Sequence, residues 1–158
     1  MIKRAVYPGT FDPITLGHLD IIKASSLIFD EVVVGLLVNL KKKPMFSESK
    51  RKEMIELVLE KNGITNVLVK SFYGLAVEFV VQEKAVVLIR GLRLTTEYES
   101  ELNISFNNYQ LDEMVTTILI PPMQKHVHIS SSAVRELIAF KSNKLDKYLP
   151  AEVITLLD

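Results

Sequence analysis

Cysteine is absent from this chain of 158 residues. Disulfides, thiolate zinc sites and cysteine nucleophiles are therefore excluded. An excess of charge of one sign is also missing, because nineteen basic and nineteen acidic residues cancel. No overall field favours nucleic acid or a membrane surface as a partner, so any anion site must be built locally.

Long hydrophobic runs and targeting patterns are absent as well. The longest apolar runs, such as residues 32–38, are too short to span a bilayer. The first four residues lead directly into a strand-like segment, and they show no signal-peptide pattern. We therefore expect a cytoplasmic protein, with neither a membrane nor nucleic acid among its partners.

What is present is an ordinary globular composition, 48% hydrophobic and 24% charged. The length suits one domain that can bury a real core. No internal repeat, low-complexity stretch or linker interrupts the chain. We predict a single domain over residues 1–158.

Short apolar runs alternate with segments of helical period. The predicted strands are residues 5–7, 31–38, 66–70, 86–89 and 116–120. Helical stripes lie between and after them, at Leu19, Ile22 and Phe29, at Met54, Leu57 and Val58, over residues 75–82, at Leu102, Phe106 and Tyr109, at Val134, Leu137 and Ile138, and after Pro150. The strand runs are almost continuously apolar, as in parallel strands covered on both faces. The order predicts an α/β fold, a Rossmann-like, doubly wound, five-stranded parallel sheet, with chemistry in the loops that follow the strands.

The first such loop, residues 7–18, reads Tyr-Pro-Gly-Thr-Phe-Asp-Pro-Ile-Thr-Leu-Gly-His. Its prolines stiffen the turn, and Gly17 would let the backbone approach a ligand closely. His18 falls in the first helical turn, where free N–H groups and the helix dipole favour phosphate, and Thr10 can donate from the loop. Neither a GxGxxG fingerprint nor a P-loop is present. The residues alone leave an ordinary helix start with a surface histidine as an equal alternative.

A lysine cluster follows the second predicted strand. Lys41, Lys42 and Lys43 come directly before Pro44. A solvated charge run is the usual meaning of such a cluster. In an otherwise neutral chain, however, a group of cations on the same sheet edge as His18 suits a polyphosphate.

The fourth predicted strand ends in Arg90-Gly91-Leu92-Arg93. Arginine forks beside a close-approach glycine suit bidentate binding of phosphate. The alternative is that these arginines pair with the acidic residues of the next helix, which are Glu97, Glu99 and Glu101. An exposed acidic face is expected for two of those three carboxylates.

The serines at 130–132 open the helix that follows the fifth predicted strand. They combine an N-cap, hydroxyl groups and unpaired backbone donors, which can form an anion site. Ser-rich N-caps are common, so the bare motif is weak. His126 and His128 could suggest a metal site, but the wall of a pocket is the better interpretation. Arg135 lies one turn further along and could assist.

These motifs resemble a known family. Thr15-Leu16-Gly17-His18 is similar to the T/H-x-G-H signature of the nucleotidylyltransferase superfamily. The longer string at 7–18 resembles the phosphopantetheine adenylyltransferase family specifically. The Lys-Lys-Pro-Met-Phe, I-R-G-L-R and I-S-S-S strings follow in the order that this family has. The resemblance covers essentially the whole chain.

The resemblance implies a nucleotidyltransferase of coenzyme A biosynthesis. The phosphate of 4′-phosphopantetheine would attack the α-phosphorus of ATP and give dephospho-coenzyme A and pyrophosphate. Mg²⁺ would be the cofactor, held mainly by the ATP phosphates and not by protein side chains. The family also implies a homohexamer and coenzyme A as a possible feedback ligand.

The resemblance also assigns roles to residues. Thr10 would orient the nucleophile and His18 would stabilise the transition state, while Lys42 and Arg90 would hold the acceptor phosphate. The implied ATP contacts are Thr10, Phe11, His18, Gly91, Leu92, Arg93, Glu101, His126, Val127, His128, Ile129, Ser130, Ser131 and Ser132. The implied acceptor contacts are Thr10, Lys42, Gly74, Leu75, Ala76 and Arg90. Lys41 and Lys43 are expected to be solvated.

Three other classes share parts of the pattern. A transferase that makes NAD or a CDP-alcohol shares T/H-x-G-H but should lack the lysine and arginine strings. A non-catalytic nucleotide-binding regulator should have lost His18 or the serines, and both are present. A flavodoxin-like or receiver domain needs a flavin loop or an acidic cluster, and neither is visible. The chain departs from the family pattern at Ala76, Ser100, His126 and His128.

Overall fold

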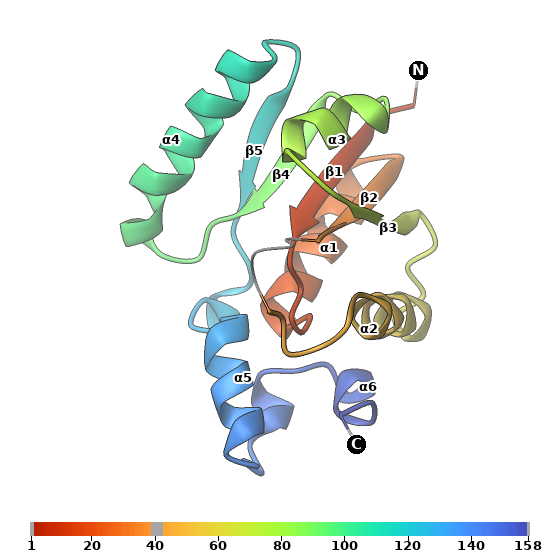
Figure 1. Ribbon diagram of the computed structural model, residues 1–158, viewed down its shortest axis with the longest axis vertical. Coiled ribbons are helices and arrows are strands. Elements are labelled where there is room, and N and C mark those ends of the chain that lie inside the picture. Colours follow the sequence, from red (N-terminus) through yellow and green to blue (C-terminus); the bar gives the residue numbers. More distant parts are fainter. Residues whose placement is uncertain (1, 39–42, 158) are drawn as a thin grey trace.

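A computed structural model describes residues 2–38 and 43–157 (Figure 1). Its centre is one five-stranded sheet in the order β3-β2-β1-β4-β5. The strands are β1 (Arg4–Gly9), β2 (Glu31–Leu37), β3 (Val67–Phe72), β4 (Val87–Gly91) and β5 (Thr116–Ile120). Every neighbouring pair is parallel. The predicted fold class is therefore confirmed, and the strand boundaries differ from the prediction by only a few residues.

The sheet opens between β1 and β4. β1 pairs with β2 along its whole length, up to Gly9 opposite Leu36. It pairs with β4 only at Ala5 and Val6. The last residues of β1 therefore have no neighbour on the β4 side. This is also the point at which the strand order reverses direction, and ligands bind at that point in open α/β sheets.

Helices connect the strands and cover both faces of the sheet. They are α1 (Leu16–Ile28), α2 (Glu48–Lys61), α3 (Ala76–Gln82), α4 (Thr95–Leu111), α5 (Ser131–Ala139) and α6 (Ala151–Ile154), with 3₁₀ turns at Gln124–His126 and Leu145–Lys147. Side-chain oxygens cap the first turns of three of them, from Thr15 in α1, Ser47 in α2 and Ser130 in α5. These three are the positions where the sequence offers a Ser or Thr before a helical stripe.

Two apolar clusters hold the layers together. The larger one packs α1, α2, α5 and α6 against one face, with Ala5, Val32 and Val34 among its strand residues. The smaller one packs α3 against the other face, around Val6 and Val33. Consecutive residues of β1 and β2 thus point to opposite clusters, which is why these strands are apolar throughout rather than alternating.

Helix α4 differs from the others because it buries almost nothing within the chain. It lies beside β5 at one side of the sheet (Figure 1). Asn108 is its only buried residue, and it donates to Thr117. Two members of the apolar stripe predicted for this helix, Phe106 and Tyr109, are 58% and 54% exposed. The stripe therefore does not face the core of this chain.

Within the described ranges, the helices are too short or too polar for any of them to traverse a lipid bilayer.

Candidate active site

The gap between β1 and β4 forms the floor of a cavity of about 300 Å³, here called the first cavity. Its wall comes from the first loop, the Arg90–Arg93 segment and the serines at the start of α5, three of the segments that sequence analysis singled out. The lining residues are Tyr7, Pro8, Gly9, Phe11, Thr15, Gly17, His18, Ile21, Arg90, Gly91, Arg93, Pro122, Ile129, Ser130, Ser131 and Ser132. Segments more than a hundred residues apart in sequence therefore share one cleft.

A second cavity of about 570 Å³ lies next to the first. The two share Ser131 and Ser132 at the start of α5. The residues that line the second cavity are Thr10, Asp12, Leu37, Val38, Lys43, Pro44, Glu48, Arg51, Ser131, Ser132 and Arg135. Two ligands could therefore lie side by side, with the amino end of α5 between them.

His18 is held in one orientation by the end of its own helix. The Thr15 side chain accepts a hydrogen bond from the His18 amide at 3.3 Å. In return, the Thr15 amide donates to His18 Nδ1 at 3.1 Å. This reciprocal pattern is a capping box with histidine in the place of the usual Glu or Gln. A backbone N–H can only donate, so Nδ1 is the acceptor and the ring proton lies on Nε2.

The His18 ring is kept neutral. Burial and, to a smaller extent, the nearby Arg93 charge together lower its pKa from 6.5 to about 4. Phe11 packs against the ring at a centroid distance of 4.9 Å, edge to face. At neutral pH the side chain is therefore a fixed N–H donor on the wall of the first cavity, which suits a phosphate oxygen.

This low pKa predicts a pH dependence of stability. Between about pH 6.5 and pH 4, the unfolded chain protonates His18 while the folded chain does not. The contribution of the neutral ring is thus complete above pH 6.5 and is lost as the pH falls through this window. We expect His18→Asn to remove about one proton of uptake on unfolding. Chemical denaturation at pH 7 and pH 5 measures this, and an unchanged difference between the two pH values would contradict the assignment.

Gly17 lines the first cavity without being required by the packing of the chain. A Cβ there would meet its nearest atoms, the His126 carbonyl oxygen and Thr15 Oγ1, at an ordinary 3.7 Å. Gly91 is different, because a Cβ at that position would lie 2.7 Å from Ile21. Packing against Ile21 therefore restricts position 91, whereas the packing of the chain leaves room for a Cβ at position 17, where the close approach of a ligand stays a prediction.

Gly17→Ala should separate binding from folding. We expect the thermal midpoint to stay level or rise slightly, since alanine is the better helix former. The KM for ATP should increase about tenfold, because the methyl group displaces the bound nucleotide. Gly63→Ala is the matched control. Gly63 has φ +64° and lies in open space, so its substitution should lower the midpoint without changing this KM. An unchanged KM in Gly17→Ala would show that no ligand approaches position 17.

Arg90 and Arg93 both line the first cavity, and both also form ion pairs. Arg90 binds Glu101 through two parallel hydrogen bonds of 2.8 and 2.9 Å. The Arg93 guanidinium pairs with Glu97 and donates to the Ile129 carbonyl at 2.9 Å. The ion pairs that the sequence left as an alternative are thus present. They do not exclude phosphate binding, because each pair uses only part of the five N–H donors of a guanidinium.

The amino end of α5 offers free donors between the two cavities. The Ser130 side chain accepts from the Ala133 amide, and the Ser131 hydroxyl donates to the Pro13 carbonyl at 2.9 Å. Within residues 2–38 and 43–157, the amides of Ser131 and Ser132 have no hydrogen-bond partner. Two N–H groups at a helix N-terminus are therefore available to an anion.

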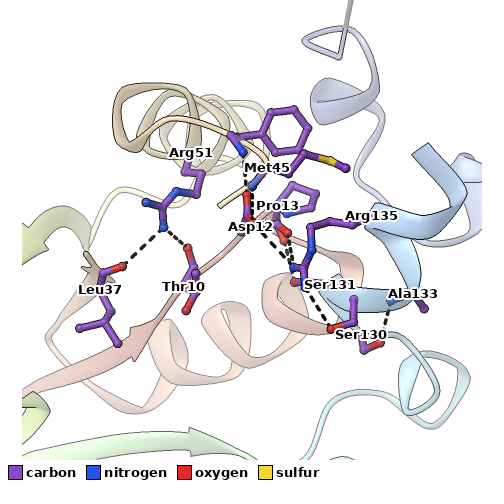
Figure 2. Close-up of polar contacts among 12 residues, drawn as sticks. Thr10, Asp12, Pro13, Leu37, Met45, Arg51, Ser130, Ser131, Ala133 and Arg135 are labelled. Carbon is purple, nitrogen blue, oxygen red and sulfur yellow. Dashed lines mark hydrogen bonds and ion pairs between the residues drawn. The ribbon is translucent and has the colours of Figure 1, made fainter. Parts of the chain in front are cut away.

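Several contacts around the first loop were not found by sequence reasoning (Figure 2). Arg51, only 2% exposed, donates to the Thr10 carbonyl at 2.7 Å. The Asp12 carboxylate accepts from the amides of Met45 and Phe46. A signal for Arg51 existed, since it occupies the same helical stripe as the predicted core residues Met54 and Val58. No such signal in the sequence pointed to Asp12, because its hydrogen-bond partners lie 33 and 34 residues away.

Other predicted contacts lie outside both cavities. His126 is turned away and pairs with Asp20 of α1 at 2.6 Å. His128 packs against Tyr148. Leu92 extends the pairing of β4 by donating to the Ile120 carbonyl. Val127 also lies outside both cavities, as do Gly74, Leu75 and Ala76 at the start of α3.

The remaining assignments divide between the cavities. Thr10 lines the second cavity, and Phe11, Gly91 and Ile129 line the first. Glu101 is connected to the first cavity through its pair with Arg90. Lys43, which was expected to be solvated, is exposed but lines the second cavity. Lys42 lies outside the described residues.

Comparison with known proteins agrees with this geometry. The family model described as cytidylyltransferase-like matches residues 6–137. The chain is 42% identical over 154 residues to a phosphopantetheine adenylyltransferase of Clostridium beijerinckii, covering 98% of this chain and 95% of that protein. It is 40% identical over 156 residues to one of Lachnoclostridium phytofermentans, covering 99% and 94%.

A solved structure from Vibrio parahaemolyticus, assigned as a nicotinate-nucleotide adenylyltransferase, superposes with a TM-score of 0.74. It covers 99% of this chain and 92% of that one at 19% identity, so it shows the fold alone. The chain belongs to the cytidylyltransferase-like family. Within that family, the full-length relatives define it more narrowly. It belongs to the phosphopantetheine adenylyltransferases, and the resemblance found in the sequence is confirmed.

Proposed function

We propose that this nucleotidyltransferase transfers the adenylyl group of ATP to 4′-phosphopantetheine, giving dephospho-coenzyme A and pyrophosphate. One observation carries the proposal. Two adjacent cavities meet at the amino end of α5, and each is lined by separate phosphate-compatible groups. That arrangement is what a reaction between two phosphorylated molecules requires, and the family assignment names the reaction.

The proposed arrangement puts the ATP phosphates in the first cavity and the acceptor arm in the second. An oxygen of the acceptor phosphate bonds to the α-phosphorus of ATP, and the bond from that phosphorus to the bridging oxygen breaks. Pyrophosphate leaves with the electron pair. The attacking oxygen is already anionic, so no general base is needed. Catalysis is then mostly positioning and stabilisation of charge at the pentavalent phosphorus.

Each residue has a defined task in this proposal. His18 donates its Nε2–H to an oxygen of the reacting α-phosphate. The amides of Ser131 and Ser132 bind further phosphate oxygens from the helix end. Thr10 orients the acceptor from the second cavity. Arg90, with Lys42 beyond the described residues, holds the acceptor phosphate and offsets its repulsion with ATP.

Mg²⁺ belongs to the proposal as an ion carried by ATP. Among residues 2–38 and 43–157, no group of three or more His, Asp or Glu side chains could hold a metal. The groups around the first cavity are mainly donors, such as the guanidinium of Arg90 and the amides at the start of α5. Such groups fit phosphate oxygens rather than a bare cation. Bound together with ATP, Mg²⁺ would supply positive charge that offsets the negative charge built up as the bond breaks.

An acceptor panel tests the function. Pyrophosphate release from ATP is measured with 4′-phosphopantetheine, with nicotinamide mononucleotide and without acceptor. We expect release only with the first, together with formation of dephospho-coenzyme A. Release with the mononucleotide instead would assign the chain to the NAD-forming branch, and binding of ATP without turnover would favour a regulator.

The remaining family properties are also proposals for this chain. We propose a cytoplasmic homohexamer in which the exposed apolar side chains of α4, among them Phe106 and Tyr109, contact other copies. Coenzyme A, which contains the acceptor arm, would compete for the second cavity. Light scattering during size-exclusion chromatography tests the oligomer, and a mass of one chain would contradict it.

A further inference from the structure

The carboxylate of Asp12 joins two segments that both line the second cavity, the first loop and residues 43–46. Its side chain is buried, with 3% of the residue exposed. Oδ2 accepts a hydrogen bond from the Met45 amide at 2.8 Å, and Oδ1 accepts one from the Phe46 amide at 2.9 Å. Both oxygens are thus used on consecutive backbone N–H groups of the segment that follows the lysines (Figure 2).

Arg135 holds the same residue from α5. Its Nη1 donates to the Asp12 carbonyl at 2.8 Å and lies 3.8 Å from the Asp12 carboxylate. The Ser131 hydroxyl donates to the next carbonyl, that of Pro13. The first loop, the segment at residues 43–46 and the start of α5 are therefore connected through one short stretch of backbone.

The segment at 43–46 forms part of the second cavity. Lys43 and Pro44 line it, and the amides bound by Asp12 belong to the two residues that follow. Met45 is 42% exposed, so packing of its side chain does little to fix the segment. Phe46 packs against the larger apolar cluster, so the cavity wall is held by that contact together with the two hydrogen bonds to Asp12.

We propose that Asp12 is a positioning residue for the acceptor: by holding the amides of Met45 and Phe46, its carboxylate sets the wall against which the acceptor phosphate and arm bind. The proposal rests on the function proposed above. In this scheme Asp12, which is itself part of the lining of the second cavity, touches neither the reacting phosphorus nor the nucleotide, and it acts by holding the neighbouring wall in place.

Asp12→Asn is the direct test, because an amide of equal size can accept one of the two N–H groups but not both. We expect the KM for 4′-phosphopantetheine to rise about tenfold, while the KM for ATP changes by less than about twofold. Asp30→Asn is the matched control. Asp30 also accepts a backbone amide, that of Lys3 at 2.7 Å, but far from both cavities. Its substitution should leave both KM values unchanged.

Met45→Pro removes one of the same hydrogen bonds without altering Asp12, since proline lacks the N–H that donates to Oδ2. It should raise the KM for 4′-phosphopantetheine and leave the KM for ATP unchanged. This variant tests the proposal if Asp12→Asn does not fold. A merely structural role would lower the thermal midpoint and the active fraction with both KM values unchanged. That result, or an equal rise in both KM values, would overturn the proposal. If the unaltered protein fails to use 4′-phosphopantetheine, the proposed function itself is wrong.

Discussion

Replacing His18 by alanine should reduce turnover a hundredfold or more, roughly the loss found when one transition-state donor is removed. The geometry explains the size of the effect. The ring is locked by its Nδ1 contact with the Thr15 amide, and it is neutral because its pKa is about 4. A donor that is already oriented costs no reorganisation when charge develops on the α-phosphate. Initial rates of pyrophosphate release at saturating substrates measure the change, and near-normal turnover would remove His18 from this role.

Two further variants distinguish the role of Nδ1 of the His18 ring from that of Nε2. His18→Asn keeps a polar atom near the Nδ1 position and can preserve the cap on Thr15, but it cannot reach the phosphate. His18→Gln can reach further, so its amide can place N–H donors near the Nε2 position, and glutamine is also an ordinary capping-box residue. We therefore expect the Asn variant to be stable and inactive. The Gln variant should be more active than the Asn variant, and the reverse order of activity would contradict the assigned tautomer.

The sheet could be predicted from the sequence because its information is local. Each strand is a short run rich in apolar residues, and the central β1 and β2 are covered on both faces, as Val32, Val33 and Val34 show by pointing into two different clusters. The spacing of Thr15 and His18 likewise defines a capping box within four residues. Parallel strands then bring their carboxyl ends to one edge by rule. The position of the candidate site can therefore be predicted at that edge of the sheet.

Which side chains line the first cavity depends on long-range contacts, and the spacing of residues in the sequence does not determine these contacts. The opening between β1 and β4 results from a pairing that stops after Val6. Arg90 pairs with Glu101 and not with Glu97 or Glu99. The packing of α4 against β5 determines which of these carboxylates comes within reach. The two histidines at 126 and 128 were expected to share a pocket wall. In the structure His126 instead pairs with Asp20, and His128 packs against Tyr148.

The exposed stripe of α4 shows a different limit of periodicity. Its apolar spacing is that of a helix with one buried face, but no segment among the described residues buries Phe106 or Tyr109. An apolar stripe indicates that one face of a helix is suited to burial, but it does not indicate which surface covers that face.

Removing the guanidinium of Arg90 should produce the second large loss, about a hundredfold in kcat/KM for Arg90→Met. Two causes add. A fixed cation is lost from the first cavity, and the Glu101 side chain, 13% exposed, is left as an unpaired carboxylate beside the phosphates. Truncating one partner of such a pair is costly because the other charge stays behind.

The double variant Arg90→Met with Glu101→Gln separates these causes. If Arg90 binds phosphate, Glu101→Gln alone should have a mild effect, since the cation remains in the cavity. The double variant should then recover only the part of the loss due to the bare carboxylate, and it should stay well below the unaltered protein. If Arg90 serves only to anchor α4 through Glu101, the two single variants and the double variant should lose similar amounts of kcat/KM. Steady-state kinetics of the four proteins at one salt concentration distinguishes the two cases. Equal losses would mean that the phosphates are held by His18 and the end of α5 without help from Arg90.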